Sequence, residues 1–124
     1  MLGWSELIGT FIATKDHAMT TSMKPRVRFP HWRKIVVYSA DGPQPQFLLS
    51  SDSLNVIVVG LEAGQQIPPH AESLAMYHVL EGDGVIFLDD EILSVEAGDT
   101  VIAPKGATRG VRADSKLAFI ATKV

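Results

Sequence analysis

The chain has 124 residues, of which 46% are hydrophobic and 20% charged, and it contains no cysteine. This length predicts one domain with a buried core, and the absence of cysteine excludes disulfides, thiolate metal ligands and a cysteine nucleophile. No apolar stretch approaches the ~18 residues of a membrane-spanning helix, and the N-terminus lacks the basic leader of a signal peptide. We therefore expect a cytoplasmic protein without a membrane partner.

The formal net charge of −3 is unevenly distributed along the chain. Residues 1–40 contain six Lys/Arg against two Asp/Glu, giving +4, whereas residues 41–124 contain five against twelve, giving −7. The overall acidic balance and the lack of a recognisable nucleic-acid module predict no nucleic-acid partner. We expect the basic segment Lys24–Lys34 to dock on the acidic part of its own fold or of a second subunit.

Residues 1–34 are predicted to form an N-terminal arm. Apolar residues at helical spacing over Trp4–Ile12 favour a short amphipathic helix, and a strand over Gly9–Thr14 is the alternative. The remainder of the arm is polar, with one possible strand around Val27. An arm of this length commonly packs across a neighbouring subunit, so we expect a homodimer with the arm and Ile35–Ser50 at its interface.

From Ile35 onward, short β-rich runs alternate with turn residues. The expected strands are Ile35–Tyr38, Phe47–Ser50, Leu54–Leu61, Met76–Leu80, Gly84–Leu88, Ile92–Val95, Thr100–Ala103, Arg109–Arg112 and Leu117–Thr122. Turn signals at roughly every 8–12 residues between such strands are typical of a sandwich or a barrel. The sequence therefore predicts an all-β domain over residues 35–124.

The stretch Gly64–Gly84 contains the most informative polar residues. His70 and Glu72 are spaced i, i+2, and side chains at that spacing lie on one face of a strand. The run Met76–Leu80 then ends in a Glu-Gly-Asp-Gly turn. This pattern predicts a strand that directs His70 and Glu72 to one place, followed by a second strand and a hairpin.

Residues in the C-terminal 70 residues match both parts of a known sequence pattern. The matching residues are Gly64, five residues before His70; the turn Val79-Leu80-Glu81-Gly82; and Gly98-Asp99 followed by Pro104. In these positions the chain resembles a small single-domain cupin of the cupin 2 type. The resemblance implies a double-stranded β-helix, a jelly-roll barrel whose mouth holds the functional site.

In metal-binding cupins, three His and one Glu hold an iron, manganese, nickel, zinc or copper ion. In this chain His70 matches the first position, and Glu72 replaces the second His and could still ligate through oxygen. The Glu position falls on Ala75, or on Tyr77 in an alternative register, and the last His position is Arg109. The resemblance therefore leaves His70 and Glu72 as candidate ligands of a divalent transition metal.

Arg109 is the main objection to a metal. A guanidinium stays protonated at physiological pH and does not ligate metals, so its charge would repel a cation. We expect Arg109 to occupy part of the metal's space and to form a bidentate pair with Glu72. Tyr77 is expected to line the barrel, and His78, at the opposite strand parity, to face outward.

Three interpretations remain open. In the first, His70, Glu72 and Arg109 form a polar cluster that only supports the structure. In the second, a barrel pocket with His70, Glu72, Tyr77 and Arg109 binds a small anionic or sugar-like molecule without a metal. In the third, the chain is a metal-dependent dioxygenase, isomerase or decarboxylase with an atypical site at His70 and Glu72. The sequence assigns no catalytic residue.

Overall fold

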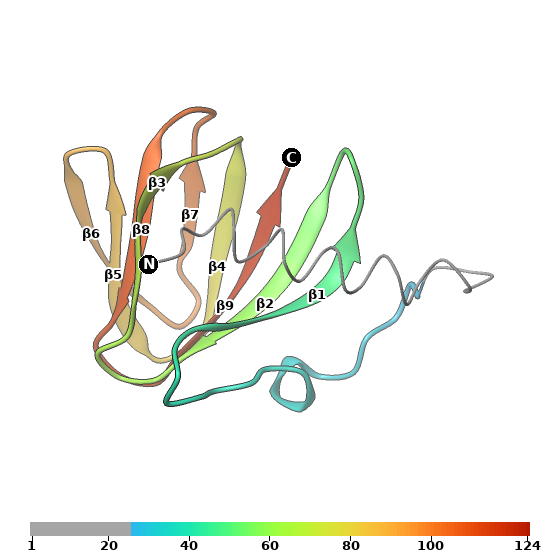
Figure 1. Ribbon diagram of the computed structural model, residues 1–124. Helices are drawn as coiled ribbons and strands as arrows, with labels where there is room; N and C mark the ends of the chain where they lie inside the picture. Colours follow the sequence, from blue (N-terminus) through green and yellow to red (C-terminus); the bar gives the residue numbers. More distant parts are fainter. Residues whose placement is uncertain (1–25) are drawn as a thin grey trace.

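The computed structural model describes residues 26–124 (Figure 1). The expected helix over Trp4–Ile12 and its alternative strand lie outside the described residues. The expected strand around Val27 is wrong, because the chain there has no regular structure before the short 3-10 helix η1 (Trp32–Lys34). Within residues 26–124, no helix is long and apolar enough to cross a membrane.

The all-β prediction is confirmed. The strands are β1 (Gln44–Ser50), β2 (Asn55–Leu61), β3 (Gln66–Ala71), β4 (Ala75–Glu81), β5 (Asp83–Leu88), β6 (Glu91–Glu96), β7 (Thr100–Ala103), β8 (Thr108–Ala113) and β9 (Leu117–Lys123). Turn residues separate them where expected: Gly82 and Gly98, for example, both adopt positive φ between successive strands, a conformation that glycine reaches without strain.

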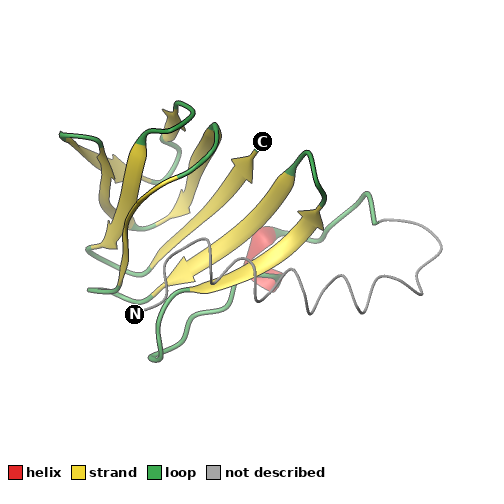
Figure 2. Cartoon of the chain, turned by 45° about the horizontal axis from the view of Figure 1, so that its top comes forward, coloured by secondary structure: helices red, strands yellow, loops and turns green. Residues whose placement is uncertain are grey.

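The strands form two antiparallel sheets that face each other (Figures 1 and 2). One sheet has the order β1-β2-β9-β4-β7 and the other β3-β8-β5-β6. Alternate side chains of each strand turn into the space between the sheets, as Leu117, Phe119 and Ala121 of β9 do. The resulting apolar core and strand order are those of a jelly-roll double-stranded β-helix.

The prediction of a strand over Ile35–Tyr38 is wrong, because this segment pairs with no strand. It instead lies against the outer face of β2 at Gly60, where an added Cβ would stand 2.3 Å from the carbonyl oxygen of Val37. β-Branched residues suit a half-buried surface whether or not they join a sheet. The apolar run therefore reflects partial burial against the sheet rather than strand pairing.

One end of the barrel gathers three segments that are far apart in sequence. The turn after β3, the turn before β8 and the end of β9 meet at the top of Figure 1. Backbone hydrogen bonds connect them, from Gly106 N to Glu72 O at 2.8 Å and from Val124 N to Leu74 O at 3.0 Å. This end contains the predicted site residues, and we call it the barrel mouth.

Candidate functional site

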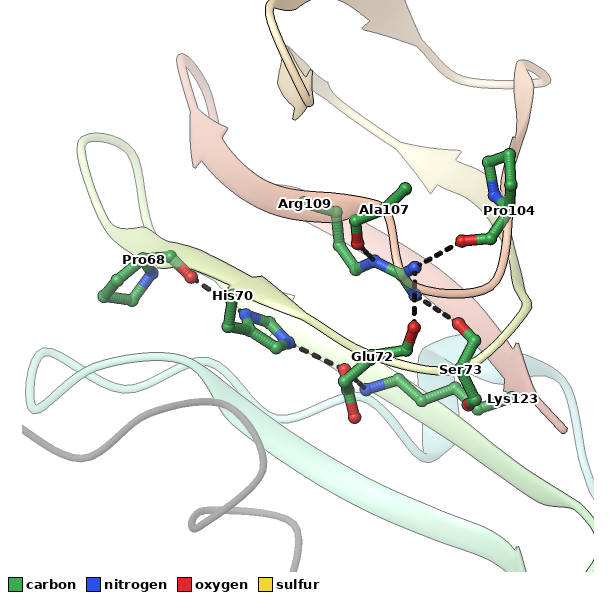
Figure 3. A network of polar contacts seen from close by, with 8 residues as sticks. All are labelled: Pro68, His70, Glu72, Ser73, Pro104, Ala107, Arg109 and Lys123. Carbon is green, nitrogen blue, oxygen red and sulfur yellow. Dashed lines mark hydrogen bonds and ion pairs between the residues drawn. The ribbon is translucent and has the colours of Figure 1, made fainter.

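His70 and Glu72 meet at the barrel mouth, as their spacing predicts. His70 lies near the end of β3 and Glu72 follows that strand. The His70 Nε2 atom is 2.7 Å from Glu72 Oε2, and each side chain is 15% exposed (Figure 3). Both residues are therefore partly shielded from water while remaining reachable from outside.

The His70 ring makes a polar contact through each of its two nitrogens. Its Nδ1 atom lies 3.0 Å from the carbonyl oxygen of Pro68, and its Nε2 atom lies on the Glu72 carboxylate. A carbonyl and an ionised carboxylate only accept hydrogen bonds, so both contacts are satisfied when both ring nitrogens carry a proton. The two contacts hold the ring between the Pro68 carbonyl and the Glu72 side chain.

Lys123, the last residue of β9, is a member of the site that the sequence analysis missed. Its Nζ atom donates to Glu72 Oε2 at 2.7 Å, and the residue is only 3% exposed. Burial lowers the pKa of Lys123 to about 8, the Glu72 carboxylate opposes that shift, and the nearby charge of Arg109 adds to it. The signal was present in the sequence, because Leu117, Phe119, Ala121 and Lys123 share one strand face.

The Glu72 carboxylate is ionised in this surrounding. Burial acts to raise its pKa, but the hydrogen bond with His70 and the charge of Lys123 together hold the pKa below its usual value. A single oxygen, Oε2, accepts from both partners. Glu72 is therefore a shared counterion for two basic side chains.

Arg109 is almost fully buried, with 1% of its surface exposed. Its Nε donates to Ala107 O at 2.9 Å, its Nη1 to Ser73 O at 2.6 Å, and its Nη2 to Glu72 O at 3.2 Å and to Pro104 O at 2.9 Å (Figure 3). The expected bidentate pair with the Glu72 carboxylate is wrong, because the guanidinium lies among backbone carbonyls instead. Arg109 connects the turn after β3 to the turn before β8.

Tyr77 faces the barrel interior and His78 does not, as the strand parity predicts. Tyr77 packs edge-on against Phe119, with ring centroids 5.8 Å apart. Burial raises the pKa of Tyr77 to about 12, although the charge of Arg109 opposes this. The ring of His78 lies on the other face of β4, where its Nδ1 is 2.8 Å from Thr100 Oγ1.

The donor groups at the mouth, as arranged, do not fit a transition-metal ion. Residues 26–124 contain no group of three or more His, Cys, Asp or Glu side chains that could hold one. Two ligands of one tetrahedral ion at about 2.1 Å would stand about 3.4 Å apart, whereas His70 Nε2 and Glu72 Oε2 are 2.7 Å apart. Lys123 also places a cation on the same carboxylate oxygen.

Comparison with known proteins identifies the fold family. A family model described as a cupin domain matches residues 57–122, which is more than half of the chain. The chain belongs to the cupin family. This membership confirms the resemblance inferred from Gly64, His70 and Pro104, and it agrees with the jelly-roll arrangement of the strands. A search of curated proteins found no match.

Solved cupin-like structures superpose on most of this cupin. A conserved protein of unknown function from Streptococcus pyogenes is 23% identical, with a TM-score of 0.75 over 84% of this chain and 96% of its own. A cupin superfamily protein from Desulfitobacterium hafniense is 15% identical, with a TM-score of 0.73 over 81% and 93% of the two chains. KdgF from a Halomonas species is 21% identical, with a TM-score of 0.61 over 67% and 79%. These likenesses show the fold alone.

Proposed function

We propose that this cupin binds a small anionic or sugar-like molecule, such as a carboxylate or a sugar acid, at the barrel mouth without a metal. One observation carries the proposal. In the part of the chain that the structure describes, three basic side chains meet at the mouth around one carboxylate: His70 and Lys123 contact the Glu72 carboxylate, and Arg109 donates to the Glu72 backbone carbonyl. The cluster has an excess of positive charge, because Lys123 and Arg109 outnumber the one carboxylate.

An excess of positive charge at a partly buried site attracts anions. Coulomb attraction increases as the effective dielectric constant falls below that of water, and a surface with an excess of one sign of charge concentrates ions of the opposite sign. His70 is 15% exposed and offers a route for a ligand from solvent. We assign the direct contacts to His70 and Lys123, with Glu72 holding both in place.

Arg109 and Tyr77 have supporting roles in this proposal. The donors of Arg109 are engaged with four backbone carbonyls, so it contributes charge and fixes the two turns rather than gripping the ligand. Tyr77, packed on Phe119, closes the interior beneath the mouth. The ligand would therefore bind at the mouth and not deep in the barrel.

A metal-dependent enzyme is the second candidate. It is favoured by cupin membership and by the adjacency of His70 and Glu72 at two of the family's ligand positions. This alternative requires the 2.7 Å contact between them to open, Lys123 to leave Glu72, and a further donor from another chain, a water molecule or the undescribed residues.

The test uses the full-length protein with chelator present. Acetate, lactate, gluconate, glucuronate and inorganic phosphate are compared with uncharged glucose by thermal shift, and the strongest is then titrated calorimetrically. We expect at least one anion to bind, and His70→Gln to weaken it by about tenfold or more through loss of a charged hydrogen bond.

Lys116→Met is the matched control, because Lys116 is an exposed lysine 3.6 Å from Glu62, away from the mouth. The affinity of the Lys116→Met protein for the anion should equal that of the unmodified protein. Failure of every anion to bind, or equal binding by His70→Gln, would contradict the proposal.

A further inference from the structure

We infer that the Lys123 ammonium is the resident cation of this barrel, standing in place of a metal ion, and that Ala75 is the residue that makes room for it. The inference concerns the same site as the proposed function, but it does not require that any anion bind. It explains why His70 and Glu72 lie at the mouth although residues 26–124 contain no group of side chains that could hold a metal ion.

The first argument is the contact geometry. Lys123 Nζ and His70 Nε2 each lie 2.7 Å from the same oxygen, Glu72 Oε2. A carboxylate oxygen accepts along about two lone-pair directions. Lys123 and His70 therefore take up the directions from which this oxygen would bind a metal.

The second argument is the strand register. Lys123 on β9 is the direct cross-strand partner of Ala75 on β4. Side chains of directly opposed residues share one face of the sheet and lie within about 5.5 Å of each other at Cβ. In one of the two registers of the cupin pattern, Ala75 is also the position of the Glu ligand, and the Ala75 side chain is buried.

These two positions act as a pair. The short side chain of Ala75 leaves space beside it, and the long side chain of Lys123 starts from the neighbouring strand and reaches Glu72. A carboxylate is absent at position 75 and an ammonium is present at position 123, so the charge at the mouth is supplied by the chain itself. A buried ammonium also repels a divalent ion at close range.

The experiment restores a family-type donor set and removes the resident cation. In the variant Ala75→Glu/Lys123→Ala, Glu72, His70 and a new carboxylate at position 75 face the same mouth. Mn²⁺, Ni²⁺ and Zn²⁺ are titrated calorimetrically into full-length proteins after dialysis against chelator, and bound metal is counted by elemental analysis. The unmodified protein and Ala75→Glu/Lys116→Ala serve as references.

We expect the unmodified protein to bind these ions only weakly, and the Ala75→Glu/Lys123→Ala protein to bind at least one of them about tenfold more tightly or better, because a repelling charge is removed. The Ala75→Glu/Lys116→Ala control should stay weak, because Lys123 would pair with the new carboxylate. Adding His70→Ala to the metal-binding variant should remove the gain.

The inference is overturned if the unmodified protein already holds about one ion per chain at His70, or if the folded double variant binds no better than its control. Should the double variant fail to fold by circular dichroism, Lys123→Met decides the matter. It should show tighter metal binding than Lys116→Met, and equal binding by the two would overturn the inference. Failure of the anion screen leaves this outcome unaffected, because only metal affinity is measured.

Discussion

The Arg109 side chain shows how one buried residue organises the barrel mouth. Its guanidinium donates to four backbone carbonyls in the turns on either side of the site. Backbone carbonyls that are buried without a donor cost about 1–3 kcal/mol each. Arg109 therefore stabilises the turns that hold Glu72 and Ser73 in position.

Replacing Arg109 by Met should lower the free energy of unfolding by about 3–5 kcal/mol, since the buried carbonyls lose their donors. Urea denaturation measures this change. Arg112→Gln is the control, because Arg112 is a partly exposed residue paired with Asp114, and it should change stability by no more than about 0.5 kcal/mol. A loss below about 1 kcal/mol for Arg109→Met would contradict the structural role.

The titration of Lys123 predicts a pH dependence of stability. Burial lowers its pKa from 10.5 to about 8 in the folded protein. Between these values the unfolded chain keeps a proton that the folded protein has lost, so the free energy of unfolding rises with pH. The full shift corresponds to about 3 kcal/mol, and the gain should be absent in Lys123→Met.

The measurement is the difference in unfolding free energy between the two proteins at about pH 7.5 and about pH 10, the window in which the lysine titrates. Tyr38 and Tyr77, whose pKa values are both raised to about 12, reduce stability above about pH 10, but they do so equally in both proteins. Parallel pH profiles for the two proteins would contradict a buried, titrating Lys123.

At the scale of strands and segments, the sequence predicted most of the barrel because each strand is bounded by its own turn signal. The segment Ile35–Tyr38 is wrongly predicted as a strand, because its composition reflects partial burial against β2 and not hydrogen bonding to it. That distinction depends on Gly60, whose missing Cβ allows the close approach of Val37. No local pattern reveals such a long-range contact.

Gly60→Ala tests that contact. An added methyl group 2.3 Å from the Val37 carbonyl oxygen must displace the segment, and overpacking of this kind costs about 1–3 kcal/mol. We expect a lower unfolding free energy and faster tryptic cleavage after Lys34, measured by urea denaturation and by time-resolved proteolysis. Unchanged stability and cleavage would show that the segment does not depend on this face of β2.

The sequence predicts only part of the candidate site, because the rest depends on contacts between distant segments. His70 and Glu72 follow from the period of one strand, so their meeting was expected. Lys123 joins them through the pairing of β9 with β4, where it faces Ala75, and pairing of strands 48 residues apart is a property of the whole sheet. The carbonyl partners of Arg109 come from turns whose path the sequence does not specify.

At the scale of the whole molecule, the structure leaves an apolar face on the sheet that contains β4, β7 and β9. A groove of about 200 Å³ lies there, lined by Leu74, Ala75, Met76, Ile102, Thr122 and Val124. Leu74, Met76, Ile102 and Val124 are exposed in the single chain. Apolar surface of this kind is common at contacts between subunits.

The homodimer inferred from the sequence stays a prediction, with a direct test. Analytical ultracentrifugation of the full-length protein should give the mass of two chains. Ile102→Lys should dissociate the dimer if the apolar face forms the contact, whereas a dimer that survives this change would favour the N-terminal arm and Ile35–Ser50. A monomer at every concentration would contradict the prediction.

The central claim is that the cation at the barrel mouth is a lysine of the chain and not a metal. Elemental analysis by mass spectrometry, on protein purified without chelator or metal-affinity resin, tests it most directly. The account predicts far less than one transition-metal ion per chain, with no change in His70→Ala. About one ion per chain, lost in His70→Ala, would contradict it and indicate a metal-dependent cupin.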